Sequence, residues 1–240
     1  DFQQYEAFSP RVGIVYQPFQ PISLYTSYSR SFSPAQSVFE NLFPEPERGT
    51  QYEVGAKVDL SNRLSATLAF YDLTRSNVLT TDPNIPLNSI PVGEQNSRGS
   101  EFDISGDILP GWDIIAGYAY TDSRITKDNS SNQGNRINNV PYNSFNLWTT
   151  YELQSGDLQG LGFGLGLFYE GDRQGDLGSS FELPCYLRTD AAIFYEREQF
   201  RAALNFRNLF DIEYFGSSFS QGRVFYGSPF TVQGAISWKF

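Results

Sequence analysis

The sequence of 240 residues contains no histidine and a single cysteine, Cys185. Without histidine the chain lacks the commonest metal ligand and the commonest general base, and no Ser-His-Asp arrangement can form. A lone cysteine cannot form an internal disulfide. Little of the chemistry on which enzymes depend is left. We therefore predict that the chain is not an enzyme, binds no metal ion directly and carries no covalently bound cofactor.

The chain also lacks long hydrophobic runs and an excess of basic residues. No apolar run approaches the roughly 20 residues that a membrane-spanning helix requires, which excludes a helical membrane protein. The 17 Lys and Arg against 27 Asp and Glu give a net charge of -10. Because phosphate binding requires clustered cationic side chains, nucleic acid is not an expected partner. The first residues, DFQQYEAF, show no signal-peptide pattern.

Aromatic residues are abundant, at 16% of the chain, and apolar side chains recur at every second position. In QYEVGAKVDL (51–60) the even-numbered residues are apolar and most of the others are polar or charged. The same alternation appears in EFDISGDI, in RAALNFRNLF and in the C-terminal FTVQGAISWKF. A period of two predicts β-strands with two unlike faces. A charged face is too costly for a sandwich core, but it suits a wet lumen when the other face meets lipid.

Eleven segments show this pattern, each about as long as a tilted transmembrane strand. They lie near residues 8–17, 22–31, 50–60, 64–74, 97–108, 113–122, 142–153, 160–171, 185–196, 199–209 and 229–240. Short turns (PFQP, SNR, LPGW, QSGDLQ, REQ) follow the odd-numbered segments, and long polar loops follow the even-numbered ones. A sandwich or a propeller is the alternative, but we find no repeat of about 40 to 50 residues. The predicted fold class is all-β, a transmembrane antiparallel β-barrel.

In such a barrel each strand pairs with its sequence neighbours, and the two faces meet different surroundings. The predicted outward set is Tyr52, Val54, Phe102, Ile104, Leu204 and Phe206. The predicted inward set is Glu53, Lys57, Glu101, Asp103 and Arg201. If the C-terminus lies at the periplasmic rim, the SNR and REQ turns lie in the periplasm, and the NLFPEPE and YFGSSFSQ loops lie outside the cell.

Several stretches together resemble one family. The segment LPCYLRTDAAIFYEREQFRAALNFRNLFDIEYF, followed by YGSPFTVQGAISWKF, resembles the end of a TonB-dependent siderophore receptor of the ferrichrome-receptor kind. PERGTQYEVGAKVDL, SRGSEFDISGDILPGW and NVPYNSFNLWTTYEL resemble earlier parts of its barrel. The resemblance spans about the whole chain. One departure is Phe230, which stands where many members have the Arg of G-x-P-R-T, so no role of that Arg carries over.

The resemblance implies a barrel of 22 strands plugged by an N-terminal domain. Residues 1–240 would then be the C-terminal half of the barrel, with the plug and the first half absent. It also implies an outer-membrane receptor for uptake of a ferric siderophore, energised by the TonB complex through the missing N-terminal region. A passive porin-like channel is the alternative, and an outer-membrane hydrolase ranks third. Plug sequence upstream would separate the receptor from the porin.

The resemblance also suggests roles for two C-terminal aromatic residues and for the charged residues of the lumen face. Trp238 and Phe240 resemble the C-terminal signal that the barrel assembly machinery reads, and they also suit an aromatic girdle at the lipid interface. Charged residues on the lumen face would form a hydrated wall, part of which faces the plug. These lumen candidates are Glu53, Lys57, Glu101, Asp103, Arg188, Asp190, Arg201 and Arg207.

Recognition is expected from the long loops, because loops on a rigid barrel carry binding sites. The aromatic candidates for contact with an organic ligand are Phe39, Phe43, Phe181, Tyr214, Phe215, Phe219, Phe225 and Tyr226. No strongly cationic pocket is visible, so we expect a hydroxamate or another chelate of low charge rather than a highly anionic catecholate.

Two further motifs suggest a phosphate loop and a calcium site, but neither interpretation is supported by its sequence context. GLGFGLG (160–166) has no helix after it, so it does not indicate a phosphate loop. Its glycines would instead lie on the lumen face and let a plug approach closely. Asp172 and Asp176 could touch a calcium ion, but their spacing does not follow the calcium-loop pattern, and a solvated loop is the simpler interpretation.

Overall fold

The computed structural model describes residues 6–34, 45–82 and 89–239. Eleven strands form one antiparallel sheet in the order β1-β2-β3-β4-β5-β6-β7-β8-β11-β12-β15. Their bounds are Arg11–Phe19, Ile22–Ser33, Glu47–Asp59, Leu64–Thr81, Ser89–Leu109, Trp112–Lys127, Asn143–Glu152, Leu161–Glu170, Tyr186–Arg197, Phe200–Arg207 and Thr231–Trp238. Two small hairpins, β9 (Arg173–Gln174) with β10 (Glu182–Leu183) and β13 (Phe215–Ser220) with β14 (Arg223–Tyr226), lie in the loops.

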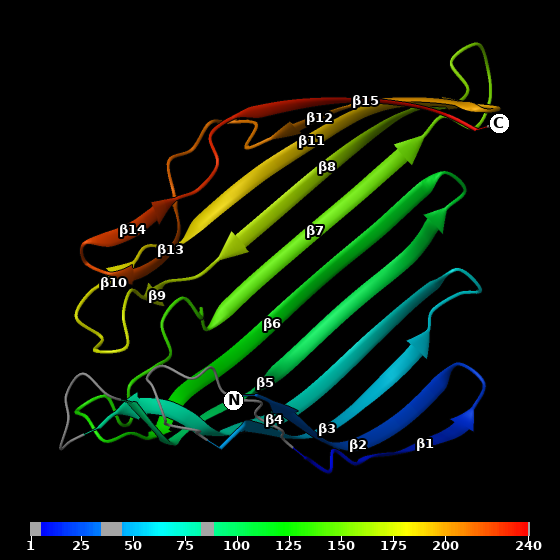
Figure 1. The fold of residues 1–240 in the computed structure, drawn as a ribbon. Coiled ribbons are helices and arrows are strands. Elements are labelled where there is room, and N and C mark those ends of the chain that lie inside the picture. The colour runs from blue at the N-terminus through cyan, green and yellow to red at the C-terminus, as the bar shows by residue number, and fades with distance from the viewer. Residues whose placement is uncertain (1–5, 35–44, 83–88, 240) are drawn as a thin grey trace.

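Each of the eleven strands pairs with its neighbour in sequence, apart from the inserted hairpins, which confirms the predicted antiparallel order. The sheet is curved and open, with β1 at one edge and β15 at the other (Figure 1). The barrel is therefore not closed within this chain. No helix among the described residues has the length and hydrophobicity to cross a membrane.

The register places the predicted outward and inward sets on opposite faces. One row joins Ala66, Ile104, Ala116, Leu147 and Leu167 across five strands. We call this side the aliphatic face. It also contains the outward set predicted from the sequence: Tyr52, Val54, Phe102, Ile104, Leu204 and Phe206. The opposite side, the polar face, contains Glu53, Lys57, Glu101, Asp103 and Arg201.

A two-sheet core is missing from the part of the chain that the structure describes. There the buried hydrophobic residues are only Ala69, Ile125, Leu183, Ala192 and Tyr214. By contrast, Val54 is 54% exposed and Ile236 78% exposed. A sandwich would bury such side chains between its sheets, so the sandwich interpretation is wrong. The aliphatic face requires an apolar environment outside the chain, as the outer face of a membrane barrel does.

Aromatic pairs lie toward both ends of the aliphatic face. The rings of Tyr28 and Tyr52 are 5.2 Å apart toward the long loops, and those of Phe200 and Trp238 are 6.0 Å apart at the short-turn end. These positions suit the two aromatic girdles of a membrane barrel, and a girdle role for Trp238 stays a prediction. Phe240 lies outside the described residues.

The predicted turns lie at one end of the sheet and the predicted loops at the other (Figure 1). The predicted alternation of length has one exception: the β4–β5 connection (82–88) is shorter than the β7–β8 connection (153–160), because β4 and β5 extend into the predicted loop. The turn between β5 and β6 contains Gly111 at φ +78°, a conformation that few other residues adopt. A Cβ at this position would also lie 2.5 Å from the carbonyl oxygen of Glu152. Glycine therefore satisfies both the turn and the close approach of β7.

Three strands are longer than the sequence pattern predicted. β4, β5 and β6 contain 18, 21 and 16 residues, whereas about 9 to 11 cross a bilayer. Their extra residues lie toward the long loops. There apolar and polar residues no longer alternate regularly along the chain, so the sequence pattern does not mark the strand. The hairpins β9–β10 and β13–β14 were not predicted either, because their strands are only 2 to 6 residues long.

Candidate functional site

Three long loops at one end of the sheet join into a single body. They connect β6 to β7, β8 to β11 and β12 to β15, and Figure 1 shows the hairpins of the last two side by side. Ser218 lies at their junction and is 4% exposed. Its N–H donates to Asn139 Oδ1 at 2.7 Å, and its carbonyl accepts from Asn139 Nδ2 at 2.7 Å. The Ser218 hydroxyl donates to the carbonyl of Gly175, which lies in the β8–β11 loop.

Arg173 joins two of these loops, the β8–β11 loop that contains it and the β12–β15 loop. Its side chain is 1% exposed, and its guanidinium donates to Glu170 and, at 2.6 Å, to the carbonyl of Phe215. The guanidinium also lies 5.3 Å from the ring centre of Tyr186. A buried cation with a carboxylate, a carbonyl and an aromatic ring as partners holds its surroundings in place. These contacts fix the β13–β14 hairpin against the end of β8.

Asn208 holds the start of the last loop. It is fully buried, and its N–H donates to Asp190 Oδ1 at 2.8 Å. Its amide group donates to the carbonyls of Ile212 and Ser228 at 2.9 and 3.1 Å and accepts from Ile212 N–H at 3.0 Å. Asp211 caps the return by accepting from the N–H of Phe230 at 2.7 Å. The NLFD segment (208–211) thus holds the loop-side ends of β12 and β15 together, and we call it the clasp.

The predicted loop aromatics divide into supporting and exposed residues. Tyr214 is buried, 4.4 Å from Tyr186 between ring centres, and Phe181 covers Gly175. Phe215 contacts Tyr226 at 5.1 Å between ring centres. Phe219, Phe225 and Tyr226 are 70%, 59% and 72% exposed. Phe39 and Phe43 lie outside the described residues. We call the surface formed by these joined loops, at the end of the sheet away from the short turns, the rim. It presents three large exposed aromatic side chains, Phe219, Phe225 and Tyr226, on loops that hydrogen bonds hold in place.

The predicted lumen candidates all lie on the polar face, and several are already paired with the wall. Arg188 forms a two-point ion pair with Asp190 at 3.0 and 3.1 Å and lies 4.5 Å from the ring centre of Phe168. Arg201 Nη1 lies 3.5 Å from Glu196 Oε2. Glu53 accepts from Tyr25 and Gln51 at 2.7 and 3.0 Å. Glu53, Glu101 and Asp103 lie on the polar face without an ion-pair partner among the described residues.

The glycines of GLGFGLG lie on the polar face but leave no free space there. A Cβ on Gly162 would lie 2.1 Å from the ring of Phe194, and one on Gly166 would lie 2.7 Å from the ring of Trp148. Gly164 is also covered by Trp148. The small residues therefore make room for aromatic rings of adjacent strands rather than for a separate domain.

Asp172 and Asp176 serve the loop that contains them. Asp172 accepts from the N–H of Cys185 at 2.8 Å, and Asp176 accepts from the hydroxyl and N–H of Ser180. The Ser180 hydroxyl, and then its N–H, hold the pKa of Asp176 below its ordinary value. At pH values above the ordinary pKa of an aspartate, the ionised Asp176 therefore stabilises the folded loop. This stabilisation is lost as the pH falls through the lowered pKa of Asp176. Among the described residues no group of three or more His, Cys, Asp or Glu could hold a metal ion.

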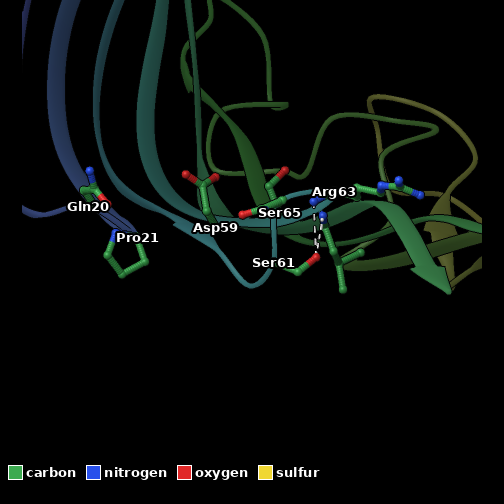
Figure 2. Close-up of a pocket in the computed structure, with 8 residues that line it drawn as sticks. Gln20, Pro21, Asp59, Ser61, Arg63 and Ser65 are labelled. Atoms are coloured by element: carbon green, nitrogen blue, oxygen red, sulfur yellow. Dashed lines mark hydrogen bonds between the residues drawn. The ribbon is translucent and has the colours of Figure 1, made fainter. Parts of the chain in front are cut away.

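A cavity of about 650 Å³ lies at the short-turn end (Figure 2). It is lined by Gln20, Pro21, Asp59, Ser61, Asn62, Arg63, Leu64 and Ser65. The Ser61 hydroxyl accepts from the N–H groups of Arg63 and Leu64 at 3.2 and 3.1 Å, which shapes the turn. This cavity lies at the opposite end of the sheet from the exposed aromatics, so it is not part of the rim.

The sequence did not reveal the residues that join the loops. Asn139 and Ser218 are 79 positions apart, and nothing in their local sequence links them. Asn139 has φ +62°, a conformation that asparagine tolerates better than most residues. The NLFD segment was part of the family resemblance, but its role as a clasp appears only in the structure.

Comparison with known proteins gives a consistent result. The family described as "TonB dependent receptor-like, beta-barrel" matches residues 1–209. The metal-pseudopaline receptor CntO of Pseudomonas aeruginosa is 37% identical over 232 residues, covering 95% of this chain and 33% of the relative. The ferrichrome outer membrane transporter/phage receptor of Escherichia coli K12 is 34% identical over 241 residues, covering 97% and 32%.

Solved structures agree with the observed fold. The siderophore receptor PiuA from Acinetobacter baumannii has a TM-score of 0.84 at 29% identity, covering 97% of this chain and 36% of that one. The ferripyoverdine receptor of Pseudomonas aeruginosa has a TM-score of 0.79 at 27% identity, covering 99% and 33%. The chain therefore spans about a third of the length of the relatives it matches.

Proposed function

Because the chain belongs to the TonB-dependent receptor family, as the match over residues 1–209 shows, we propose that it forms part of the wall of a receptor that takes up a ferric siderophore. Members of this family lie in the bacterial outer membrane, as the E. coli relative does. The observation that carries the proposal is the fastened rim, which presents Phe219, Phe225 and Tyr226 at the loop end of a lipid-facing wall.

A passive porin is not favoured. The relatives are named as receptors or transporters for metal-pseudopaline, ferrichrome and ferrioxamine B. A rim with exposed aromatic side chains also suits contact with an organic chelate. Among the described residues, Arg223 is the cation that lies beside these aromatics, 5.9 Å from the ring centre of Phe219. We therefore propose a hydroxamate or another chelate of low charge as ligand, carried as cargo.

The open sheet supports a longer working unit. The edges at β1 and β15 would expose unpaired backbone groups to hydrocarbon, at several kcal/mol for each group. We propose that the full-length receptor supplies the remaining strands and a plug, and that the plug engages the TonB complex. On the wall, Glu53, Glu101 and Asp103 offer negative charge to cationic plug residues.

The exposed aromatics can be tested directly. We expect the full-length receptor with Phe219→Ala, Phe225→Ala and Tyr226→Ala to bind a ferric hydroxamate at least about tenfold more weakly, because aromatic anchors typically contribute 1 kcal/mol or more each. Binding is measured by fluorescence titration of the purified receptor. A matched control, Tyr151→Ala on the aliphatic face, removes an exposed aromatic at the other end and should leave affinity unchanged. Equal affinity of the triple variant and wild type would contradict the rim assignment.

A further inference from the structure

A column of aromatic rings covers the polar face of β8, which lies between β7 and β11 (Figure 1). On this face Phe168 is followed, toward the short turns, by glycine at positions 166, 164 and 162. Trp148 of β7 and Phe194 of β11 lean over these glycines from the two sides. We call the three rings of Phe168, Trp148 and Phe194 the aromatic lane.

The rings of the lane lie close together and keep part of their surface accessible. A Cβ added to Gly166 would lie 2.7 Å from the Trp148 ring and 2.9 Å from the Phe168 ring, so these two rings meet over one glycine. Gly162 lies under the ring of Phe194. The glycines are buried, whereas the three rings are only half-buried. From Phe168 to Gly162 the column is about 20 Å long, because a strand rises by ~3.4 Å per residue.

The lane begins next to the hairpin that presents the exposed aromatics of the rim. The guanidinium of Arg188 lies 4.5 Å from the ring centre of Phe168 and donates to the Tyr214 hydroxyl at 3.5 Å. Tyr214 immediately precedes β13, the first strand of that hairpin. A planar guanidinium packs flat against an aromatic ring. Arg188 therefore continues the surface of the lane to the rim.

Two cationic side chains border the lane along β12. Arg201 lies 5.8 Å from the ring centre of Phe194, and its side chain is 54% exposed. Arg207 lies on the same face of β12, nearer the loops, and is exposed. It has no ion-pair partner among the described residues. Guanidinium groups attract oxygen atoms that carry negative charge, and aromatic rings favour contact with organic groups.

The other side of the polar face has a different character. On β2 this face is formed mostly by serines, with Tyr25 among them. The Tyr71 ring lies on the same face of β4, where its hydroxyl is 2.9 Å from that of Thr121. An aromatic column with cations beside it is thus a feature of β7, β8, β11 and β12.

We propose that the aromatic lane is a second binding site for the ferric chelate, over which the ligand passes after it leaves the rim. This inference rests on the proposed function. The occupant is indicated by the connection of the lane to the rim through Arg188, and by the charges along its border. The rings contact the organic part of a chelate of low charge, and Arg201 and Arg207 attract the oxygen atoms that bind the iron.

The test compares variants of the full-length receptor in a receptor-deficient strain. Trp148→Leu with Phe194→Leu removes two rings of the lane but keeps apolar side chains over the glycines. Phe194→Leu alone is a milder variant, and Tyr71→Leu is its matched control, since it removes one ring from the same face outside the lane. The maximal rate of uptake is measured with a radiolabelled ferric hydroxamate. Affinity is measured on de-energised cells, and folding by the mobility of unheated protein in gels.

We expect the maximal uptake rate to fall about threefold in Phe194→Leu and on the order of tenfold in the double variant, because each lost aromatic contact weakens binding several-fold. Affinity on de-energised cells should stay as in wild type, because the rim is unchanged. Tyr71→Leu should take up the chelate at the wild-type rate. If the double variant does not fold, the comparison of Phe194→Leu with Tyr71→Leu decides.

A wild-type uptake rate in the folded lane variants would overturn the proposal. Greater entry of a large antibiotic without a loss of uptake rate would overturn it as well, because the lane would then seat the plug. The failure of the proposed function looks different, since the wild-type receptor itself would then take up no chelate. Normal wild-type uptake together with unaffected lane variants would refute the lane alone.

Discussion

At the scale of single residues, the fastening of the rim depends on a few buried polar groups. Ser218, Asn139 and Arg173 each join loops that are distant in sequence. Buried hydrogen bonds of this kind are costly to break, because the remaining partner is left without water or protein contact. The exposed aromatics are thereby held on a support that is rigid relative to an ordinary loop.

We expect Asn139→Ala to loosen all three loops at once. The change leaves the buried N–H of Ser218 without its acceptor, at a cost of about 1 to 3 kcal/mol in local opening free energy. Hydrogen exchange of the full-length receptor should show faster exchange in residues 171–185 and 208–230 as well as near the substitution. Asn129→Ala is the matched control, since it removes an exposed bond of 3.2 Å to Thr80. Faster exchange confined to residues 128–142 would show that the loops are not one body.

These contacts could not be predicted from the sequence. Asn139 and Ser218 look like ordinary loop residues, and their partnership depends on how three separate loops return to one place. The aromatic candidates illustrate the same limit. Tyr214 and Tyr226 have the same chemistry and lie in one loop, yet one is buried and the other is 72% exposed.

At the scale of elements, the alternation of side chains predicted most of the architecture. Val54 lies on the aliphatic face and Glu53 on the polar face. A one-residue slip of β3 would move each side chain to the opposite face, so the register of β3 is strongly specified. The pattern stopped being informative in TRSNVLTT, where β4 continues beyond the apolar part of the face. Backbone pairing with β5 maintains the strand there without help from hydrophobic periodicity.

The two faces of β12 should respond differently to the same charge. Leu204→Arg places a cation against lipid and should destabilise the folded full-length barrel by about 2 to 4 kcal/mol if the position lies near the midplane. Asn205→Arg, one residue away, points to the polar face and should change stability by less than about 1 kcal/mol. Urea unfolding of the receptor in lipid vesicles measures both. Similar losses for the two variants would contradict the assignment of the faces.

At the scale of the whole molecule, the turns and loops must lie on opposite sides of the membrane. We expect cysteines at Asn62 and Gly222 to label oppositely with an impermeant thiol reagent on intact cells, in a full-length background with Cys185→Ser. Gly222 lies in the β13–β14 turn and is exposed, whereas Ser218 is too buried to report accessibility. The account predicts labelling at Gly222 only, and labelling at Asn62 only would show that the orientation is inverted.

The open sheet also explains why the chain should not act by itself. An odd number of strands puts the ends of the sheet on opposite sides of the membrane, whereas single-chain bacterial barrels have an even number. The unpaired edges of β1 and β15 require further strands, and directed uptake requires a plug that responds to TonB. Both requirements belong to the longer receptor that we propose.

The most direct measurement is growth of a receptor-deficient strain on a ferric siderophore under iron limitation. We expect the full-length receptor to restore growth only when TonB is present, and residues 1–240 expressed alone not to restore growth. TonB-dependent growth supported by residues 1–240 would contradict the account, because this chain would then be a complete receptor. Growth with the full-length protein in the absence of TonB would contradict it as well, because a passive channel would suffice.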